Sequence, residues 1–282
     1  MPKALVTGSA GFIGYHLCRR LLAEGWQVTG LDALTDYYDV TLKERRHQML
    51  AQSAGFTPLV ARLEDEAGLS DLLAELGPDV VVHLAAQAGV RYSIDAPRTY
   101  LNSNLIGTFN LLEAVRATPV KHLLMASTSS VYGANVDMPY GETDKADSQM
   151  SFYAATKKAN EAMAHSYAHL YDIPLTMFRF FTVYGPWGRP DMAIFKFTRA
   201  ILNGEAIEVY NHGDMRRDFT YVDDLIEALW RLIGVVPERP TVATDIAEGD
   251  SLSPVAPFRV VNIGNAAPVA LMDFITAVEQ AT

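Results

Sequence analysis

The sequence contains a single cysteine, Cys18, so no disulfide bond can form within the chain. One thiol in 282 residues is typical of a protein from a reducing compartment, and we expect Cys18 to be buried rather than reactive. No apolar run approaches the roughly 20 residues that a membrane-spanning helix needs, so no membrane association is expected. Basic residues are outnumbered, with 23 Lys and Arg against 33 Asp and Glu. The formal net charge of −10 argues against general binding of nucleic acid, although a small anionic substrate needs only local arginines.

The composition is otherwise that of a folded globular protein, with 49% hydrophobic and 20% charged residues. A chain of this length can bury a large core and forms one large domain or two unequal lobes. The sequence shows no internal repeat beyond recurring strand–helix units, and no pattern of metal ligands is predicted.

The most informative stretch is a glycine-rich turn near the start of the chain. A run of β-forming residues at 3–7 is followed by three glycines spaced G-x-x-G-x-x-G, and then by apolar residues at helical spacing. In such a strand–turn–helix, the first glycine permits the tight turn, the second lets the backbone approach a pyrophosphate, and the third lets helix and strand pack closely. The free N–H groups at the start of the helix then face the phosphate charge. The predicted dinucleotide contacts of this turn are Gly8, Gly11, Phe12, Ile13 and Gly14.

A second apolar run begins at Trp26 and ends at Asp32, 18 residues after Gly14. This is the usual place of the acid that hydrogen-bonds the adenosine ribose. A carboxylate there favours NAD as the cofactor, because it would repel the 2′-phosphate of NADP. The alternative to a dinucleotide site is an ordinary strand–helix–strand unit with a glycine turn. This alternative is weaker, because the turn, the helix, the second strand and the acid all occur together in the expected order.

The rest of the chain alternates between strands and helices, which predicts an α/β fold built on a doubly wound parallel sheet (Rossmann-like). After Asp32, strands are expected at 57–61, 79–84, 120–125 and 175–181, and helices at 42–52, 67–76, 98–116 and 151–171. Beyond residue 186 the pattern loosens, with helices expected at 193–202, 222–233 and from 271, strands at 207–210 and 260–264, and a surface loop at 237–257. We expect residues 1–185 to form an NAD-binding domain that carries the catalytic residues. Residues 186–282 are expected to form mainly a smaller C-terminal substrate-binding lobe, with part of the chain returning to the main sheet.

Tyr153 and Lys157 lie four residues apart, which places them on one face of the helix predicted at 151–171. A tyrosine with a pKa near 10 is a poor base at neutral pH. The positive charge of Lys157, together with that of nicotinamide, favours the phenolate and brings Tyr153 into the range of a working general base. Lys157 can also reach the hydroxyls of the nicotinamide ribose. A Tyr-x-x-x-Lys match alone indicates a surface pair, but after a dinucleotide turn and a hydroxyl-rich strand end it predicts a catalytic pair.

Four hydroxyl side chains, Ser127 to Ser130, follow the strand predicted at 120–125. Ligands of open α/β sheets bind at the carboxyl ends of the strands. A hydroxyl there can hydrogen-bond the substrate hydroxyl as it loses its proton, and Thr128 is the strongest candidate. A polar loop of Ser/Thr turns is the alternative, and it carries more weight for Ser129 and Ser130.

These residues carry a resemblance to a known family. The chain resembles an extended short-chain dehydrogenase/reductase of the nucleotide-sugar epimerase and dehydratase group, and within it most closely the UDP-glucuronate 4-epimerases. The similarity covers nearly all 282 residues. Its motifs are the glycine turn, 32–39 (DALTDYYD), 83–93 (HLAAQAGVRYS), 153–158 (YAATKK), 179–192 (RFFTVYGPWGRPDM) and 210–219 (YNHGDMRRDF). The last two strings are specific to the subgroup.

The resemblance implies a role for each matching residue. Tyr153 corresponds to the family's base, Lys157 to its partner and Thr128 to its catalytic Ser/Thr. The usual Asp near the adenine is replaced by Arg62-Leu63. The further NAD contacts implied by the resemblance are Leu63, Leu84, Ala85 and Ala86.

The resemblance also implies a site for a UDP-uronic acid. Arg217 matches a ligand of the UDP diphosphate, and Thr182 and Arg189 correspond to residues that hold the sugar carboxylate. The bidentate geometry of an arginine suits a carboxylate, although a structural salt bridge is the alternative for Arg189. The remaining substrate contacts expected are Arg91, Ser127, Thr128 and Ser129.

The implied reaction is NAD-dependent 4-epimerisation of UDP-glucuronate to UDP-galacturonate through a transient 4-keto sugar without decarboxylation. NAD is regenerated in each turnover, so it is expected to stay bound. Thr182 and Arg189 are expected to fix the carboxylate near the plane of the ketone, where the bond that would release CO₂ overlaps poorly with the carbonyl. Dehydratases and decarboxylases of the group have acids where this chain has Ser129 and Ser130, which disfavours both reactions.

Two alternatives remain, a 4-epimerase of a neutral UDP-hexose and a catalytically inactive NAD-binding module. The helices predicted at 98–116 and 151–171 resemble those that form the dimer interface of relatives, so a homodimer is expected. Because the nucleotide motif begins at residue 8, it leaves no room for a signal peptide, and we expect a cytoplasmic protein.

Overall fold

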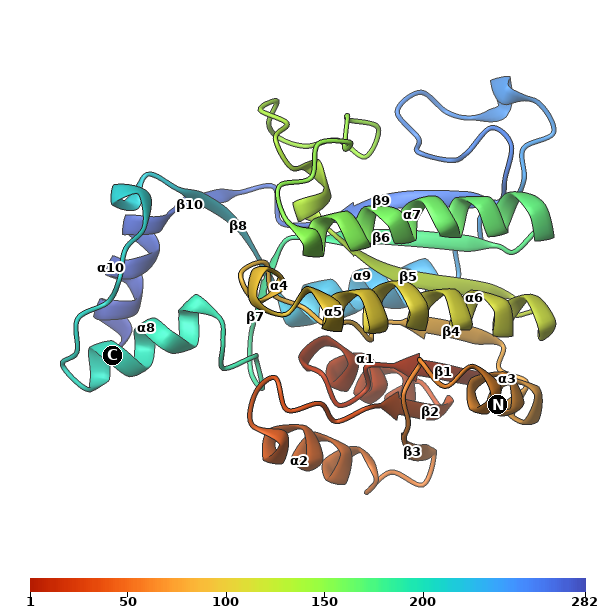
Figure 1. Cartoon of the computed structure of the whole chain (residues 1–282), viewed down its shortest axis with the longest axis horizontal. Coiled ribbons are helices and arrows are strands. Elements are labelled where there is room, and N and C mark those ends of the chain that lie inside the picture. The colour runs from red at the N-terminus through yellow and green to blue at the C-terminus, as the bar shows by residue number, and fades with distance from the viewer.

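The computed structural model describes residues 1–282, apart from the side chain of Ala243. Seven parallel strands form the main sheet in the order β3-β2-β1-β4-β5-β6-β9 (Figure 1). Their bounds are β1 Lys3–Thr7, β2 Gln27–Asp32, β3 Phe56–Val60, β4 Val80–His83, β5 His122–Thr128, β6 Leu175–Phe180 and β9 Phe258–Ile263. The strand order reverses between β1 and β4, which is the place where open α/β sheets bind their ligands. The predicted doubly wound sheet is confirmed.

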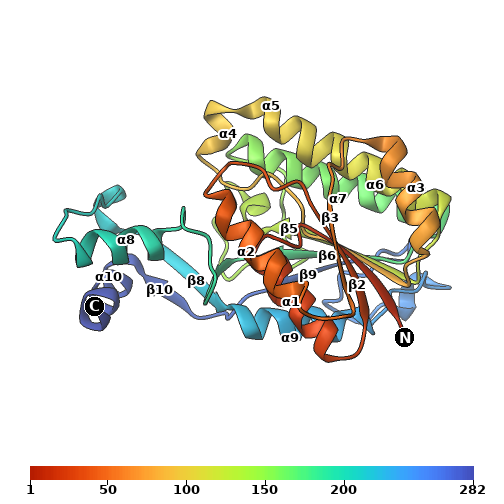
Figure 2. The same cartoon turned by 90° about the horizontal axis from the view of Figure 1, so that it is seen from below.

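Helices cover both faces of the main sheet (Figure 2). One face carries α1 Phe12–Ala23, α2 Val40–Leu50 and α9 Val222–Ile233, and the other carries α3 Glu66–Leu76, α6 Gly107–Ala117 and α7 Phe152–Tyr171. Two apolar clusters, one on each face, form the core because residues of these parallel strands alternate between the two faces. Cys18 packs in the first of them and is fully buried, as predicted.

A smaller lobe extends from the carboxyl end of the main sheet (Figure 1). Its three-stranded sheet has the order β10-β8-β7 and is accompanied by α8 and α10. The bounds are β7 Thr182–Tyr184, α8 Ala193–Leu202, β8 Arg216–Tyr221, β10 Pro268–Ala270 and α10 Leu271–Ala281. Between the two parts of this lobe the chain returns to the main sheet as α9 and β9, where β9 pairs with β6.

Two predicted elements differ from the structure. The expected strand at 207–210 is wrong, because this segment is irregular. Its alternating residues favour a strand, but the segment pairs with no strand of either sheet in the described part of the chain, and a strand is not stable without a partner. The expected single helix at 98–116 is divided into α5 Pro97–Tyr100, the π-helical turn η1 Leu101–Ile106, and α6. Such turns concentrate at functional sites.

Short elements complete the fold. They are α4 Tyr92–Asp95 and the 3₁₀ turns η2 Ser129–Tyr132, η3 Asn211–Gly213 and η4 Ala243–Asp245. None of the helices in the described residues is long and apolar enough to span a bilayer.

Candidate active site

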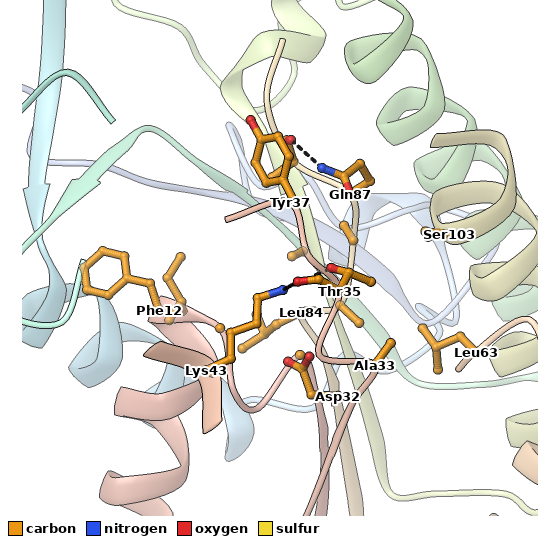
Figure 3. A pocket seen from close by; sticks show the side chains of 18 of the residues that line it. Phe12, Asp32, Ala33, Thr35, Tyr37, Lys43, Leu63, Leu84, Gln87 and Ser103 are labelled. Carbon is orange, nitrogen blue, oxygen red and sulfur yellow. Dashed lines mark hydrogen bonds between the residues drawn. The ribbon is translucent and has the colours of Figure 1, made fainter. Parts of the chain in front are cut away.

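A cavity of about 230 Å³ lies at the carboxyl ends of β1, β2, β4 and β5 (Figure 3). All of the residues predicted to contact the dinucleotide line it, although they come from five separate segments of the chain. They are Gly8, Gly11, Phe12, Ile13, Gly14, Asp32, Leu63, Leu84, Ala85, Ala86, Tyr153 and Lys157. The fold therefore brings the predicted cofactor residues together around one space, and their contacts with NAD stay a prediction.

The glycine turn has the shape that a diphosphate requires. Gly8 adopts a φ of +75°, and a Cβ at this position would lie 2.7 Å from the backbone nitrogen of Ala85. A Cβ on Gly14 would lie 2.1 Å from the carbonyl oxygen of Gly8, so no side chain fits. Helix α1 follows Gly11 without a side-chain cap, and its first intrahelical bond is donated by Tyr15. The N–H groups of Phe12, Ile13 and Gly14, in the first turn of the helix, are thus left to bind an anion.

Asp32 combines a structural contact with a place in the cavity wall. Its carboxylate accepts the backbone N–H groups of Ala10 at 3.0 Å and Leu34 at 2.9 Å, so it holds the glycine turn against the end of β2. Nearby, Lys43 donates to the carbonyl oxygen of Thr35 at 2.6 Å, as Figure 3 shows. Burial lowers the pKa of Lys43. The turn and this carboxylate together fit the diphosphate and adenosine ribose of NAD.

Tyr153 and Lys157 project from the first two turns of α7, which Ser151 caps by accepting the N–H of Ala154 at 3.1 Å. Lys157 is buried, and its Nζ donates to the carbonyl oxygen of Ala126 at 3.0 Å. Burial lowers its pKa to about 8. The predicted spacing on one helix face is confirmed.

The structure adds two groups that act on the pKa of Tyr153. Burial raises the pKa of Tyr153, while hydrogen bonding with Thr128 and the positive charge of Arg189 lower it. Lys157 was expected to be the cation that favours the phenolate. Arg189 has this effect in the structure, and the effect of Lys157 on Tyr153 stays a prediction.

The hydroxyl side chains at the end of β5 and the start of η2 lie in two different environments. Thr128 caps the turn η2 by accepting the N–H of Ser130 at 3.2 Å, and Ser129 begins that turn. Ser127 lines the cavity, but its Oγ donates to Glu161 at 2.6 Å. Ser127 thus has a buried protein partner, and its contact with substrate stays a prediction.

Glu161 belongs to a buried ion pair beneath the site. Its carboxylate accepts two hydrogen bonds from Arg179, each of 2.9 Å, and Arg179 also donates to the hydroxyl of Tyr132 at 2.8 Å. Burial alone would raise the pKa of Glu161, but the hydrogen bonds and charge of Arg179 hold it below its ordinary value. This pair joins α7 to β6 directly behind the end of β5.

Arg189 reaches the cavity from the loop between β7 and α8. Its Nε and Nη2 donate to the carboxylate of Asp191 at 3.1 and 2.6 Å. Tyr37 donates to the same carboxylate at 3.2 Å. The structural salt bridge considered as the alternative for Arg189 is therefore present. The same arginine side chain also lines the cavity.

The other predicted substrate residues lie outside the wall of this cavity. Thr182 begins β7 opposite Phe219, and Arg217 lies exposed in β8. The guanidinium of Arg91 stacks over the ring of Tyr210 at 4.0 Å. The structure thus places these three residues near or on the smaller lobe, and their substrate contacts stay predictions.

The sequence pattern did not predict some residues of the site. Arg46 in α2 is fully buried and donates to the carbonyl oxygens of Ala10, Trp187 and Gly188, which ties the glycine turn to the loop of Arg189. A basic residue in a charged helix is normally solvated, so the pattern did not indicate this. Glu64 also lines the cavity. It follows the Arg62-Leu63 pair that replaces the expected acid, and this pair was the only sequence feature that indicated a site nearby. No group of three or more His, Cys, Asp or Glu side chains in the described residues is placed to hold a metal ion.

The fold and the site together define a class of protein. Residues 4–242 match the model of the NAD dependent epimerase/dehydratase family, and the chain belongs to this family.

Individual relatives show which members of the family the chain is similar to. The chain is 57% identical over 280 residues to a probable UDP-glucuronate 4-epimerase of Rhizobium meliloti (strain 1021), covering 99% of this chain and 82% of the relative. It is 53% identical to the protein CapI of Staphylococcus aureus, covering 98% and 82%. Among solved structures, UDP-glucuronic acid 4-epimerase from Bacillus cereus in complex with UDP-glucuronic acid and NAD is similar with a TM-score of 0.85 and 33% identity, over 99% of this chain and 82% of that one.

Proposed function

We propose that the chain is an NAD-dependent nucleotide-sugar 4-epimerase that converts UDP-glucuronate to UDP-galacturonate without decarboxylation. The observation that carries this proposal is the placement of Arg189, a carboxylate-binding side chain, in the wall of the cavity that also holds the dinucleotide turn and Tyr153. The relatives from R. meliloti and B. cereus carry the corresponding activity in their names, which supports the same assignment.

The residues of the site suit the removal and return of a proton at the 4-hydroxyl. When bound, NAD supplies the acceptor and donor of the C4 hydride. Tyr153 takes the hydroxyl proton as a phenolate, a form favoured by Thr128 and Arg189 against the effect of burial. Lys157 lines the same cavity, and we expect its ammonium group to donate hydrogen bonds to the hydroxyls of the nicotinamide ribose. The hydroxyl of Thr128 stabilises the substrate oxygen as its proton leaves.

The carboxylate of the sugar needs its own restraint, because the 4-keto form of a uronic acid is a β-keto acid and loses CO₂ readily. Arg189, with Thr182, fixes the carboxylate near the plane of the ketone, so that the breaking bond would overlap poorly with the carbonyl. Ser129 and Ser130 stand where an acid would serve elimination or decarboxylation, and neither can supply one.

The test is to incubate the purified chain with UDP-glucuronate, with no cofactor added, and to follow the anomeric protons by NMR. Signals of UDP-galacturonate without release of CO₂ are expected. Formation of a UDP-pentose would refute the restraint of the carboxylate. Turnover of UDP-glucose but not of UDP-glucuronate would identify an epimerase of neutral sugars, and tight NAD binding without turnover of any sugar nucleotide would identify an inactive binding module.

We also propose that the protein acts as a cytoplasmic homodimer. Large apolar side chains remain exposed along the helices expected to form the interface, among them Ile106, Phe109 and Phe152, each more than two fifths exposed. Apolar surface of this kind marks a site of association. Light scattering would give the mass of a dimer, and a monomeric mass at micromolar concentration would refute the assembly.

A further inference from the structure

The guanidinium of Arg189 already donates two of its hydrogen bonds to a protein carboxylate. A guanidinium offers two edges to a carboxylate, one formed by Nε and Nη2 and one formed by the two Nη groups. Asp191 occupies the first edge, with bonds of 3.1 and 2.6 Å. The donors that remain for a ligand are therefore those of the Nη end, in a side chain that lines the cavity beside Tyr153.

Tyr37 holds Asp191 from a second loop. Its hydroxyl donates to Asp191 Oδ2 at 3.2 Å, and its ring lies 5.9 Å from Arg189 Cζ. The ring also packs against Tyr92 at 4.8 Å. A Cβ on Gly89 would lie 2.6 Å from the Tyr37 hydroxyl, so glycine leaves the room that this hydroxyl needs. The position of Asp191 is thus set by groups outside its own loop.

The loop that carries Arg189 and Asp191 is itself anchored. The buried Arg46 donates to the carbonyl oxygens of Trp187 and Gly188. The ring of His16 hydrogen-bonds the carbonyl oxygen of Pro186 at 2.8 Å. Three consecutive carbonyls just before Arg189 are therefore held by α1 and α2.

We propose that Asp191, supported by Tyr37, is a positioning residue that determines specificity: it holds Arg189 by the Nε/Nη2 edge and presents the Nη end to the carboxylate of a UDP-uronic acid. This inference rests on the proposed function. A long, flexible arginine that is already oriented loses less conformational freedom when it binds a carboxylate. The hydroxymethyl group of a neutral sugar has one uncharged oxygen, so it cannot pair with both donors of this edge as a carboxylate does.

Asp191 also repels the carboxylate of the substrate, and positive charges around the site reduce this repulsion. Burial alone would raise the pKa of Asp191, but Arg189 and the Tyr37 hydroxyl hold it below its ordinary value, so the group is ionised at neutral pH. Lys43 and Arg46 lie near Arg189. The charges of Arg46 and Arg189 both lower the pKa of Lys43, and both also lower the pKa of Tyr38. Their positive charges offset a second carboxylate on the guanidinium.

The test compares the binding of UDP-glucuronate and UDP-glucose by titration calorimetry. NAD-loaded Tyr153→Phe is the background, so that no turnover occurs. In this background we expect Asp191→Asn to raise the Kd of UDP-glucuronate by about tenfold, the loss of one charge-assisted contact. The Kd of UDP-glucose should change by less than about twofold. Tyr37→Phe should shift the same ratio in the same direction by a smaller factor.

The control is Glu75→Gln on the exposed face of α3, which removes a carboxylate far from Arg189 and should leave both constants unchanged. Unchanged or tighter binding of UDP-glucuronate to Asp191→Asn would overturn the inference, since Asp191 would then be a bystander or a competitor. Equal losses for both ligands would overturn it too, because they would indicate a purely structural role. If the Tyr153→Phe protein bound UDP-glucuronate and UDP-glucose with equal Kd, both the uronate assignment and this inference would be overturned. If it bound UDP-glucuronate more tightly and Asp191→Asn left this difference unchanged, only the inference would be overturned.

Discussion

Lys157 is a buried cation, and we predict that Lys157→Met stabilises the NAD-free protein while it abolishes activity. The side chain is 2% exposed and donates to the carbonyl oxygen of Ala126. Burial lowers the pKa of Lys157 from 10.5 to about 8. Because one pKa unit corresponds to about 1.4 kcal/mol, the protonated lysine costs the folded state about 3 kcal/mol at neutral pH. Loss of the hydrogen bond to Ala126 offsets about 1 kcal/mol of this, so a net gain of about 2 kcal/mol is expected.

The pH dependence of this gain is the sharper test. Since folding lowers the pKa of Lys157, the unfolded chain binds more protons than the folded one between pH 8 and pH 10.5. The stability of the parent therefore rises across this interval, until the lysine is neutral in both states. The advantage of methionine should be complete below pH 8 and should fade toward pH 10.5.

Urea denaturation of parent and variant, both freed of dinucleotide, measures the difference at neutral and at alkaline pH. Titration of all other groups cancels in this comparison. Saturating NAD should reduce or reverse the advantage, because the lysine then gains the ribose hydroxyls as acceptors. A variant less stable than the parent at neutral pH, or a difference that does not change with pH, would refute the reasoning.

Three other substitutions test the glycine turn, the buried ion pair and the arginine beside the base. Gly14→Ala would place a Cβ 2.1 Å from a backbone carbonyl of the turn, so NAD affinity should fall by at least about tenfold in a fluorescence titration; unchanged affinity would contradict the role of the turn. Glu161→Gln leaves Arg179 buried without its carboxylate and should lower the free energy of unfolding by about 3–5 kcal/mol in urea, and a loss near zero would show that the pair is dispensable. Arg189→Met removes a charge that lowers the pKa of Tyr153, so the rise of kcat with pH should move to higher pH; a profile that stays in place would show that the charge does not act on the base.

The dinucleotide half of the site was predictable because its determinants are local. The spacing of Gly8, Gly11 and Gly14 sets the path of one turn, and Asp32 follows one helix and one strand later, so short-range geometry decides where they lie. Their common place in one cavity wall follows from the parallel order of the strands, which the alternation of elements already indicates.

The electrostatics around the base depend on long-range packing and were not predictable. Lys157 is the nearest cation to Tyr153 in the sequence, but the sequence did not reveal that the charge of Arg189 also acts on Tyr153, because the loop of Arg189 folds back over the end of the sheet. The support that Tyr37 gives to Asp191 was not predictable for the same reason, since Tyr37 comes from another loop. The expected strand at 207–210 does not form because a strand needs a partner, and the local alternation of residues does not reveal whether the fold supplies one.

The route of the chain between the two lobes has a consequence for how the protein is made. The chain enters the smaller lobe after β6, returns to the main sheet as α9 and β9, and leaves again for β10 and α10. During synthesis, the outer edge of β6 stays unpaired until residues 258–263 have emerged, although six of the seven strands of the main sheet are complete by residue 180. An open strand edge of this kind is prone to pairing with other chains. The nascent dinucleotide-binding sheet thus passes through a long interval in which chaperones have a defined edge to protect.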